Sequence, residues 1–288
     1  MTSIAFVTTC KGRLHHIQQT LPLIVSQAPD EVIVVDYGCP QRVGDWVESH
    51  YPQVKVVRVE DDPGFCLPRA RNIGAKHTIS PWICFIDADV RIAPGWLQWL
   101  RTHVHPNFYF RAEPKNGIRD KETWGTVVCT RQAFEMIGGY DEVFRGWGGE
   151  DHDLYVRLRL SGMVEGAFPS LFVDAIPHDD TERIAFHDVK NRRIQAIINE
   201  LYSEAKLQIA RIRGSNSRFP WDARLALMDQ IKRAVVDWGG DKSKPMPRIS
   251  LSVKGSGWLP EPYRMLKECT FTLTLGETTG AKGNAPAE

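Results

Sequence analysis

Trp82-Ile83-Cys84-Phe85-Ile86-Asp87-Ala88-Asp89 is the stretch of sequence that decides the fold. Its apolar part, Trp82 to Ile86, predicts a strand that is buried on both faces of a parallel sheet. Two carboxylates follow at the point where this strand should end. Ligands of open α/β sheets bind beyond the carboxyl ends of strands, and buried acids need a cation or hydrogen-bond donors. Asp87 and Asp89 are therefore candidate ligands of a hard divalent ion such as Mg²⁺ or Mn²⁺, although a polar turn is the simpler interpretation of Asp-x-Asp alone.

Segments with the pattern of strands and helices alternate on both sides of this stretch. Strands are expected over residues 4–9, 31–36 and 54–59, and helices over residues 14–27, 46–50, 67–78 and 94–103. This β-α alternation predicts a parallel, doubly wound sheet.

The second half of the chain has a different pattern. Short strands are expected over residues 107–111, 125–129 and 171–176, and short helices over residues 130–139 and 150–160. Two amphipathic helices are expected over residues 187–213 and 222–238, and a weak strand over residues 270–275. We expect disorder after Gly276.

The composition excludes several classes of protein. Hydrophobic residues make up 42% of the 288 residues, and the net charge of +1 gives no field that would attract nucleic acid or a membrane. No apolar run approaches the roughly 20 residues of a membrane span, although peripheral membrane contact stays open. The six cysteines are scattered, so neither a disulfide framework nor a zinc site is expected, and a cytoplasmic location is favoured. Several of the nine tryptophans lie beside glycines and charged residues, which suits a ligand surface.

A second candidate site is Phe144-Arg-Gly-Trp-Gly-Gly-Glu-Asp-His-Asp153. Its three glycines leave Trp147 on a loop with little to hold it. Glu150 and Asp151 fall in the first turn of a helix, where the dipole favours negative charge, so we expect ionised carboxylates suited to a general base. A glycine-rich turn followed by acidic capping is the simpler alternative. Asp153 is expected to pair with Arg157, four residues later.

These two stretches together carry a resemblance to a known family. Asp87-Ala-Asp89 after a hydrophobic strand, with β-α units before it, resembles the GT-A glycosyltransferases, particularly family 2. The stretch from Gly146 to Asp153 is similar to the Trp-Gly-Gly-Glu-Asp segment of β-1,4-galactosyltransferases and related N-acetylgalactosaminyltransferases. The resemblance covers about residues 3 to 190. It implies an α/β GT-A fold, in which helices flank a mixed, mostly parallel sheet, with a C-terminal helical extension.

The resemblance also implies a domain organisation. Residues 1–186 would form the catalytic domain, with a nucleotide-sugar half over residues 1–105 and an acceptor half over residues 106–186. Residues 187–240 would form the helical extension and residues 241–288 an irregular tail.

Roles in metal and acceptor binding follow from the resemblance, position by position. Asp89 would ligate Mn²⁺ or Mg²⁺ directly, Asp87 would contact the ribose or the metal's shell, and His178 would be the third ligand. Asp151 would deprotonate the acceptor hydroxyl. Glu150 would hydrogen-bond the acceptor sugar, and Trp147 would stack on it. His187 is the alternative to His178 as metal ligand. If neither Asp151 nor Glu150 is the base, Asp153 or Asp179 is the next candidate.

The donor side follows in the same way. Thr8, Thr9 and Arg13 at the end of the first strand would bind the donor, and Asp36 would contact the nucleobase. Arg71 would lie beside the base and phosphates, with a solvated helix face as the alternative for it and for Arg69. Family 2 members often have Asp-Asp or Asp-Gly-Ser after the second strand, whereas this chain has Asp36-Tyr-Gly-Cys39, so the nucleobase stays open.

The activity that the resemblance implies is an inverting, metal-dependent glycosyltransferase. The donor would be a nucleotide-sugar, expected to be a UDP-linked hexose or N-acetylhexosamine, and the acceptor a hydroxyl of a saccharide or glycoconjugate. A phosphohydrolase of the haloacid dehalogenase type is an alternative, but that class has its Asp-x-Asp after the first strand. A nucleotidyltransferase would need a longer phosphate loop than Cys10-Lys-Gly-Arg13. An inactive nucleotide-sugar binder is the third alternative, and the intact Asp87, Asp89 and Asp151 argue against it.

Overall fold

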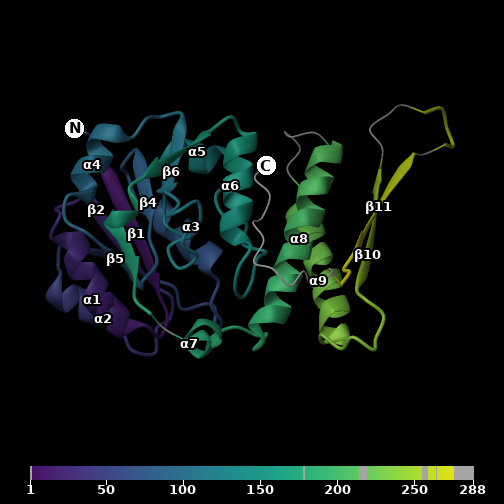
Figure 1. Ribbon diagram of the computed structural model, residues 1–288, viewed down its shortest axis with the longest axis horizontal. Coiled ribbons are helices and arrows are strands. Elements are labelled where there is room, and N and C mark those ends of the chain that lie inside the picture. Colours follow the sequence, from purple (N-terminus) through teal and green to yellow (C-terminus); the bar gives the residue numbers. More distant parts are fainter. Residues whose placement is uncertain (1, 178, 214–218, 255–258, 264, 276–288) are drawn as a thin grey trace. The chain divides into compact units, whose positions relative to one another are not determined.

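The structure is a computed structural model that describes residues 2–177, 179–213, 219–254, 259–263 and 265–275 (Figure 1). The chain divides into two compact units, Met1–Glu200 and Leu201–Glu288. Helix α8 (Arg192–Arg213) begins in the first unit and continues into the second.

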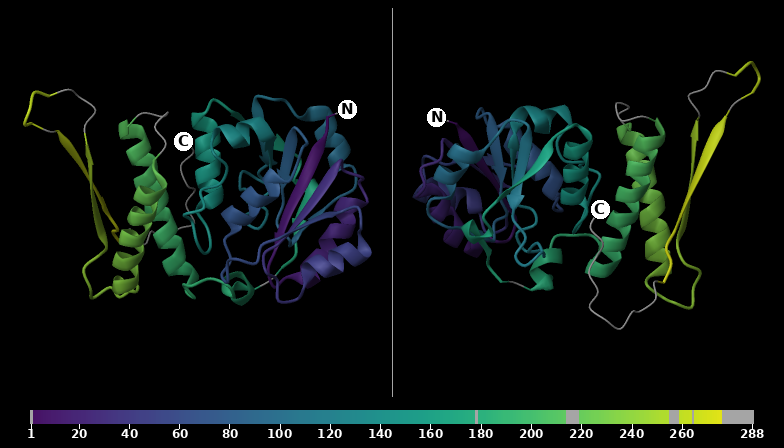
Figure 2. Two further views of the ribbon diagram at one scale, coloured as in Figure 1. Left: turned by 180° about the vertical axis from the view of Figure 1, so that it is seen from behind. Right: turned by 45° about the horizontal axis from the view of Figure 1, so that its top comes forward.

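A seven-stranded mixed sheet forms the centre of the first unit (Figure 2). Its strands, in spatial order, are β3 (Lys55–Arg58), β2 (Glu31–Asp36), β1 (Ile4–Cys10), β4 (Trp82–Phe85), β7 (Val127–Thr130), β6 (Phe108–Ala112) and β8 (Val164–Phe168). Neighbouring strands from β3 to β4 pair in parallel, β7 is antiparallel to both of its neighbours, and β8 is parallel to β6. The expected mixed, mostly parallel sheet is thus confirmed.

Helices cover both faces of this sheet because its strands are apolar on both sides. One hydrophobic cluster joins alternate strand residues to α1 (Leu14–Val25), α2 (Val43–His50) and α4 (Trp96–His103). The other cluster joins the intervening strand residues to α3 (Leu67–Lys76), α5 (Arg131–Met136) and α6 (Glu150–Leu160). Helix α3 packs closely on the sheet at Gly74, where a Cβ would lie 2.4 Å from Cγ1 of Val7.

The strand order creates a crevice at the carboxyl ends of β1 and β4. From β1 the chain moves outward through β2 and β3 and then crosses to β4, which pairs with the other side of β1. This is a topological switch point, the place where open α/β sheets bind their ligands. Thr9 from β1 and Asp87 after β4 both reach this edge.

Some elements differ from the expected ones. The strand β5 (Val90–Ile92), its pairing with β9 (Val173–Ala175), the strand β8 and the short helix α7 (Asp180–Ile184) were not predicted. Their segments have too few residues, or too little alternation, to show a period. The expected strand over residues 171–176 is shorter because a 3₁₀ turn covers Ser170–Phe172, and α8 begins at Arg192 rather than at residue 187. The disorder expected after Gly276 lies outside the described residues.

The second unit contains the rest of α8, α9 (Trp221–Trp238) and an antiparallel pair formed by β10 (Arg248–Lys254) and β11 (Leu266–Thr272). Helix α9 ends at Gly239, whose φ of 63° is the left-handed conformation expected of a C-terminal glycine. The strand over residues 248–254 was not predicted, and the predicted strand over residues 270–275 overlaps β11. Among the described helices, none has both the length and the apolar character needed to cross a membrane.

Candidate active site

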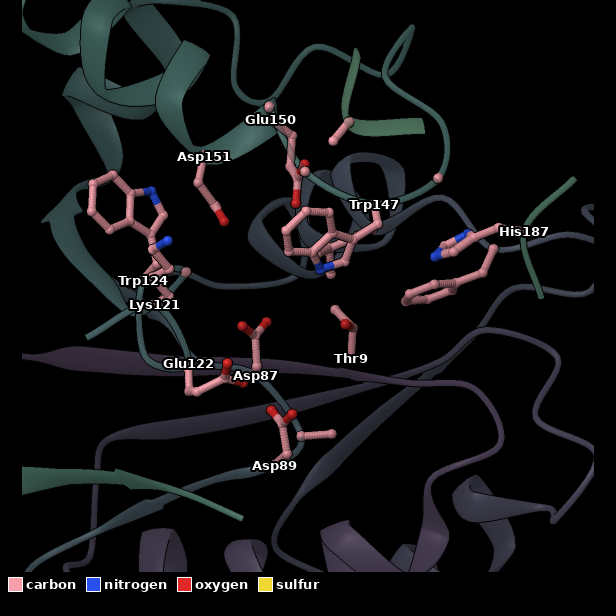
Figure 3. A pocket seen from close by; sticks show the side chains of 18 of the residues that line it. Thr9, Asp87, Asp89, Lys121, Glu122, Trp124, Trp147, Glu150, Asp151 and His187 are labelled. Atoms are coloured by element: carbon pink, nitrogen blue, oxygen red, sulfur yellow. The ribbon is translucent and has the colours of Figure 1, made fainter. Parts of the chain in front are cut away.

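A cavity of about 460 Å³ lies at the switch point of the sheet. Figure 3 shows Asp87 and Asp89, from the end of β4, on one side of it, and Glu150 and Asp151, from the start of α6, on the other. The structure thus brings most of the predicted site residues to one place: Thr9, Arg13, Asp87, Asp89, Trp147, Glu150, Asp151 and the fallback ligand His187.

Arg71 of α3 forms an ion pair with one acid from each of these two groups. Its guanidinium donates to Oδ1 of Asp87 at 2.6 Å and to Oδ1 of Asp151 at 2.5 Å. It also donates to the hydroxyl of Tyr140 at 3.0 Å, and its side chain is only 1% exposed. Arg71 is thus not among the residues that line the cavity, and the alternative of a solvated helix face is wrong for it. Its predicted position beside the base and phosphates stays a prediction. Arg71 is a buried cation that holds two carboxylates in fixed positions.

Gly125 makes this arrangement possible. A Cβ on this residue would lie 2.7 Å from Nη2 of Arg71 and 2.7 Å from Oδ2 of Asp87. Any larger side chain would push the guanidinium and the carboxylate apart.

Asp89, the second acid after β4, is held by an ion pair with Arg13. Its Oδ2 lies 3.2 Å from Nη1 of Arg13, and its side chain is 8% exposed. The backbone of this turn is fixed by Thr20, whose hydroxyl donates to the Ala88 carbonyl, and by the Ile176 amide, which donates to the Asp89 carbonyl. The predicted donor residue Arg13 thus pairs with a predicted metal ligand.

Glu150 and Asp151 differ in their surroundings although they are adjacent. Asp151 accepts from Arg71, whereas Oε2 of the buried Glu150 has no hydrogen-bond partner among the described residues. Burial raises the pKa of the Glu150 carboxyl to about 8, with a smaller contribution from the Asp151 charge. Burial also raises the pKa of Asp151, and Arg71 opposes this shift. The expectation that both acids stay ionised at neutral pH is therefore wrong for Glu150, because desolvation outweighs the helix dipole.

Asp153, the first alternative for the base, has a structural role. It is fully buried, and its Oδ2 accepts from Nε of Arg157 at 2.8 Å. Arg157 also donates to the carbonyls of Ile137 and Gly139, so the expected ion pair is present but lies inside the protein. Asp153 does not line the cavity.

The loop that carries Trp147 is held by the start of α8. Asn199 donates to the carbonyls of Trp147 at 3.2 Å and Gly148 at 2.6 Å, and Gln195 donates to that of Arg145 at 2.8 Å. The Arg192 guanidinium lies 3.8 Å from the centre of the Trp147 ring. The expectation that little holds this loop is therefore wrong: its glycines allow the turn, and a neighbouring helix supplies the donors.

We expect Asn199→Ala to loosen this loop. The substitution removes the donor to three carbonyls, and each such bond contributes about 0.5–1.5 kcal/mol. Amide hydrogen exchange over residues 144–149 should speed up by about tenfold or more, since 1.4 kcal/mol corresponds to a factor of ten. Gln98→Ala, on the exposed face of α4, is the matched control. Unchanged exchange in Asn199→Ala would mean that the loop is held in another way.

Three further predicted residues, Thr8, Asp36 and Asp179, do not line the cavity. Thr8 is buried in β1, and both carboxylate oxygens of Asp36 accept backbone amides, from Cys39 at 2.8 Å and Gly44 at 2.9 Å. Asp36 therefore shapes the turn after β2, and its predicted contact with the nucleobase stays a prediction. Asp179 caps α7 by accepting from the Glu182 amide. His178, the predicted third metal ligand, lies outside the described residues.

Several lining residues were missed by sequence reasoning. Lys121, Glu122 and Trp124 come from the loop between β6 and β7, and Ala196 and Glu200 come from α8. The neighbouring glycine at position 125 was the available signal for Trp124, since tryptophans beside glycines suit a ligand surface. The Trp124 ring is stacked on the buried Arg111, whose guanidinium lies 4.1 Å from the ring centre.

Comparison with known families agrees with this geometry. Residues 5–109 match the model of glycosyl transferase family 2, and residues 110–202 match the model described as the N-terminal domain of galactosyltransferase. The resemblance inferred from the residues is confirmed: the chain is family 2-like and carries glycosyltransferase domains from residue 5 to residue 202. These matches give no support to a phosphohydrolase.

Individual relatives are distant and longer. The chain is 25% identical to validoxylamine A glucosyltransferase of Streptomyces hygroscopicus subsp. limoneus over 224 residues, 57% of this chain and 49% of that protein. It is 26% identical to human β-1,4-galactosyltransferase 4 over 38% of this chain and 34% of that protein. The chain thus spans half or less of the length of these two relatives.

Solved structures confirm the GT-A fold. TarS 1–349 of S. aureus, solved with UDP-GlcNAc, superposes with a TM-score of 0.58 at 15% identity, covering 84% of this chain and 74% of that one. The mannosyltransferase PcManGT of Pyrobaculum calidifontis, solved with GDP-Man and Mn²⁺, gives a TM-score of 0.53 at 18% identity, covering 84% and 76%.

Proposed function

We propose that this protein transfers a sugar from a nucleotide-sugar to a hydroxyl of a saccharide or glycoconjugate acceptor, in one step that inverts the anomeric centre. The observation that carries the proposal is the ion-paired set in which Arg71 bridges Asp87, at the end of β4, and Asp151, at the start of α6. This set supports the proposal because it holds Asp87 and Asp151, at two sides of one cavity, in fixed positions. A UDP-linked hexose or N-acetylhexosamine is the expected donor.

The acidic residues of the cavity fit a divalent cation. Among the described residues, seven acidic side chains line it: those of Asp87, Asp89, Glu122, Glu150, Asp151, Glu182 and Glu200. The basic side chains that line it, or that pair with these acids, are those of Lys11, Arg13, Lys121 and Arg71. A doubly charged anion would therefore need a further positive charge to enter. Asp87 and Asp89 offer carboxylate oxygens, which suit Mn²⁺ or Mg²⁺, and would hold the ion. Such an ion would neutralise the donor diphosphate and stabilise it as it leaves.

The protein's own groups account for the acceptor side. In this proposal, Asp151 accepts the proton of the attacking hydroxyl at one carboxylate oxygen, while Arg71 holds the carboxylate in place through Oδ1. Glu150, whose raised pKa keeps it protonated at neutral pH, donates a hydrogen bond to the acceptor from the carboxyl whose Oε2 has no partner among the described residues. Trp147 covers one side of the cavity and excludes water. Water exclusion protects the donor from hydrolysis.

A donor panel tests the proposal. UDP-galactose, UDP-N-acetylglucosamine, UDP-glucose and GDP-mannose are each added with Mn²⁺, and thermal unfolding and nucleotide release in the presence of saccharide acceptors are measured. We expect one donor to raise the melting temperature, because it binds only the native state, and to be consumed when an acceptor is present. A donor that stabilises the protein but is never consumed with any acceptor would identify an inactive nucleotide-sugar binder.

A further inference from the structure

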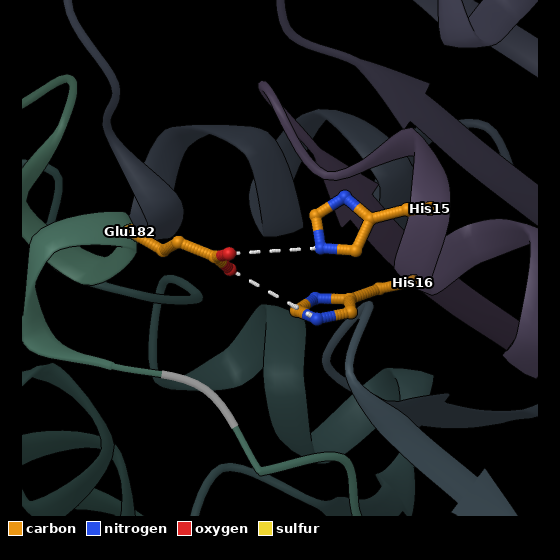
Figure 4. A group of neighbouring side chains, drawn as sticks. All are labelled: His15, His16 and Glu182. Atoms are coloured by element: carbon orange, nitrogen blue, oxygen red, sulfur yellow. Dashed lines mark ion pairs between the residues drawn. The ribbon is translucent and has the colours of Figure 1, made fainter.

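A second group of metal-ligating side chains lies outside the carboxylate set described above. His15 and His16 occupy the first turn of α1, and Glu182 faces them from α7 (Figure 4). One ligand atom from each of the three lies within 4.8 Å of the others. The spacing of cysteines, which is the sequence signal for many zinc sites, could not have indicated this group, because it contains imidazoles and no cysteine.

The spacing of these atoms suits ligands of one ion better than hydrogen bonds. Nε2 of His15 lies 3.7 Å from Oε1 of Glu182, and Nε2 of His16 lies 3.9 Å from Oε2. Both distances exceed the 2.7–3.2 Å of a normal N–H···O bond. Two ligands about 2.0–2.1 Å from a tetrahedral zinc ion lie roughly 3.3 Å apart. The side chains of His15 and Glu182 are 48% and 41% exposed, so both can make this small adjustment.

An ion pair with two protonated histidines explains the arrangement less well. The two rings are 4.1 Å apart between centroids, and the His16 side chain is only 2% exposed. Protonating both would place two like charges side by side near Glu182, one of them in a poorly solvated position. Neutral imidazoles around a shared cation avoid this repulsion.

We infer that His15, His16 and Glu182 bind a divalent transition-metal ion, with zinc as the expected one. Two imidazoles and one carboxylate form a donor set typical of zinc sites that keep an open position. This chemistry differs from that of Asp87 and Asp89, which offer only oxygen ligands. The ion would join α7 to the start of α1. It would thereby hold the wall of the main cavity to which Glu182, Phe186 and His187 contribute.

Zinc titration of the chelator-treated protein at pH 7.5, followed by calorimetry and native mass spectrometry, tests this site. Wild type should bind a zinc ion with micromolar or tighter affinity. His15→Ala and Glu182→Gln should each weaken this binding by more than about 100-fold, because even outer-shell changes cost 10- to 100-fold. Both side chains are partly exposed, so the variants should keep the wild-type circular dichroism and melting temperature.

Two control variants locate the ion. His103→Ala removes an exposed histidine of α4, and Asp89→Ala removes a carboxylate of the main cavity; both should bind zinc at this site as the wild type does. Equal zinc affinity in wild type and His15→Ala, loss of binding in Asp89→Ala alone, or no zinc bound by the wild type would each overturn the inference.

Discussion

Asp151→Asn is expected to reduce turnover by about 10²- to 10⁴-fold while leaving donor binding intact, because a positioned base contributes about this much. The amide keeps the shape of the side chain and offers an oxygen to Arg71, but it cannot take the acceptor proton. Donor affinity, measured by calorimetry in the presence of Mn²⁺, should change little. The melting temperature must be measured alongside, since Arg71 loses one charged partner in this variant.

Glu150→Gln is the matched control, because it alters the neighbouring buried acid of the same helical turn. Glutamine resembles the protonated carboxyl that burial favours at Glu150, so turnover at neutral pH should fall much less than in Asp151→Asn. The acceptor KM should rise more than kcat falls, as expected for a group that binds the acceptor. Loss of turnover in Glu150→Gln with normal turnover in Asp151→Asn would reverse the two roles.

The pH dependence of kcat/KM follows from the same two groups. Asp151 must be deprotonated to act as a base, and burial raises its pKa, so activity should fall on acidification at a higher pH than for an ordinary aspartate of pKa about 3.9. Glu150 must be protonated to donate, so activity should also fall above its pKa of about 8. Glu150→Gln should lose only the alkaline decline. An alkaline decline that persists in this variant would have another origin.

Removal of the metal is the second change for which we expect a large effect. Treatment with EDTA should abolish transfer and Mn²⁺ should restore it, because a metal at a diphosphate supplies several kcal/mol of charge stabilisation. Asp89→Ala should weaken donor binding by about 10²-fold or more in the presence of Mn²⁺, since a carboxylate that holds the ion is lost. Calorimetry with the donor and Mn²⁺ measures this affinity directly.

Two control variants distinguish the loss of the metal in the main cavity from other causes of lost donor binding or transfer. Asp174→Ala removes an exposed carboxylate of β9 that does not line the cavity, and it should bind donor as the wild type does. Rescue by Mn²⁺ in His15→Ala would show that the ion needed for transfer is not the one at α1. Full activity after exhaustive chelation would contradict a metal-dependent reaction.

Local patterns predicted most of the fold because most strands of the sheet are short apolar runs, and most are followed by a segment whose apolar residues recur at helical spacing. The same patterns placed Asp87 and Asp89 at the switch point, since their position depends only on where β4 ends. Glu150 and Asp151 could be placed for a similar reason, because a glycine loop precedes their helix. Each of these features is contained within a few neighbouring residues.

The role of Arg71 could not be predicted in this way. It depends on the contact of α3 with the end of β4 and the start of α6, which are distant in sequence, and on the missing side chain at Gly125. The support of the Trp147 loop by Gln195 and Asn199 depends likewise on a helix that follows much later in the chain. The raised pKa of Glu150 results from burial, which periodicity does not report for a polar residue in a helical first turn.

The configuration of the first product tests the proposed one-step transfer by Asp151 most directly. Proton NMR of the reaction, with the donor selected by the panel and a p-nitrophenyl glycoside acceptor, gives the anomeric coupling of the new linkage, and intact-protein mass shows whether the chain carries a sugar. An α-linked donor should give a β-linked product from the first turnover, with no glycosylated protein at any time. A product that retains the α-configuration, or a chain that carries the sugar covalently, would contradict direct displacement by a hydroxyl activated at Asp151.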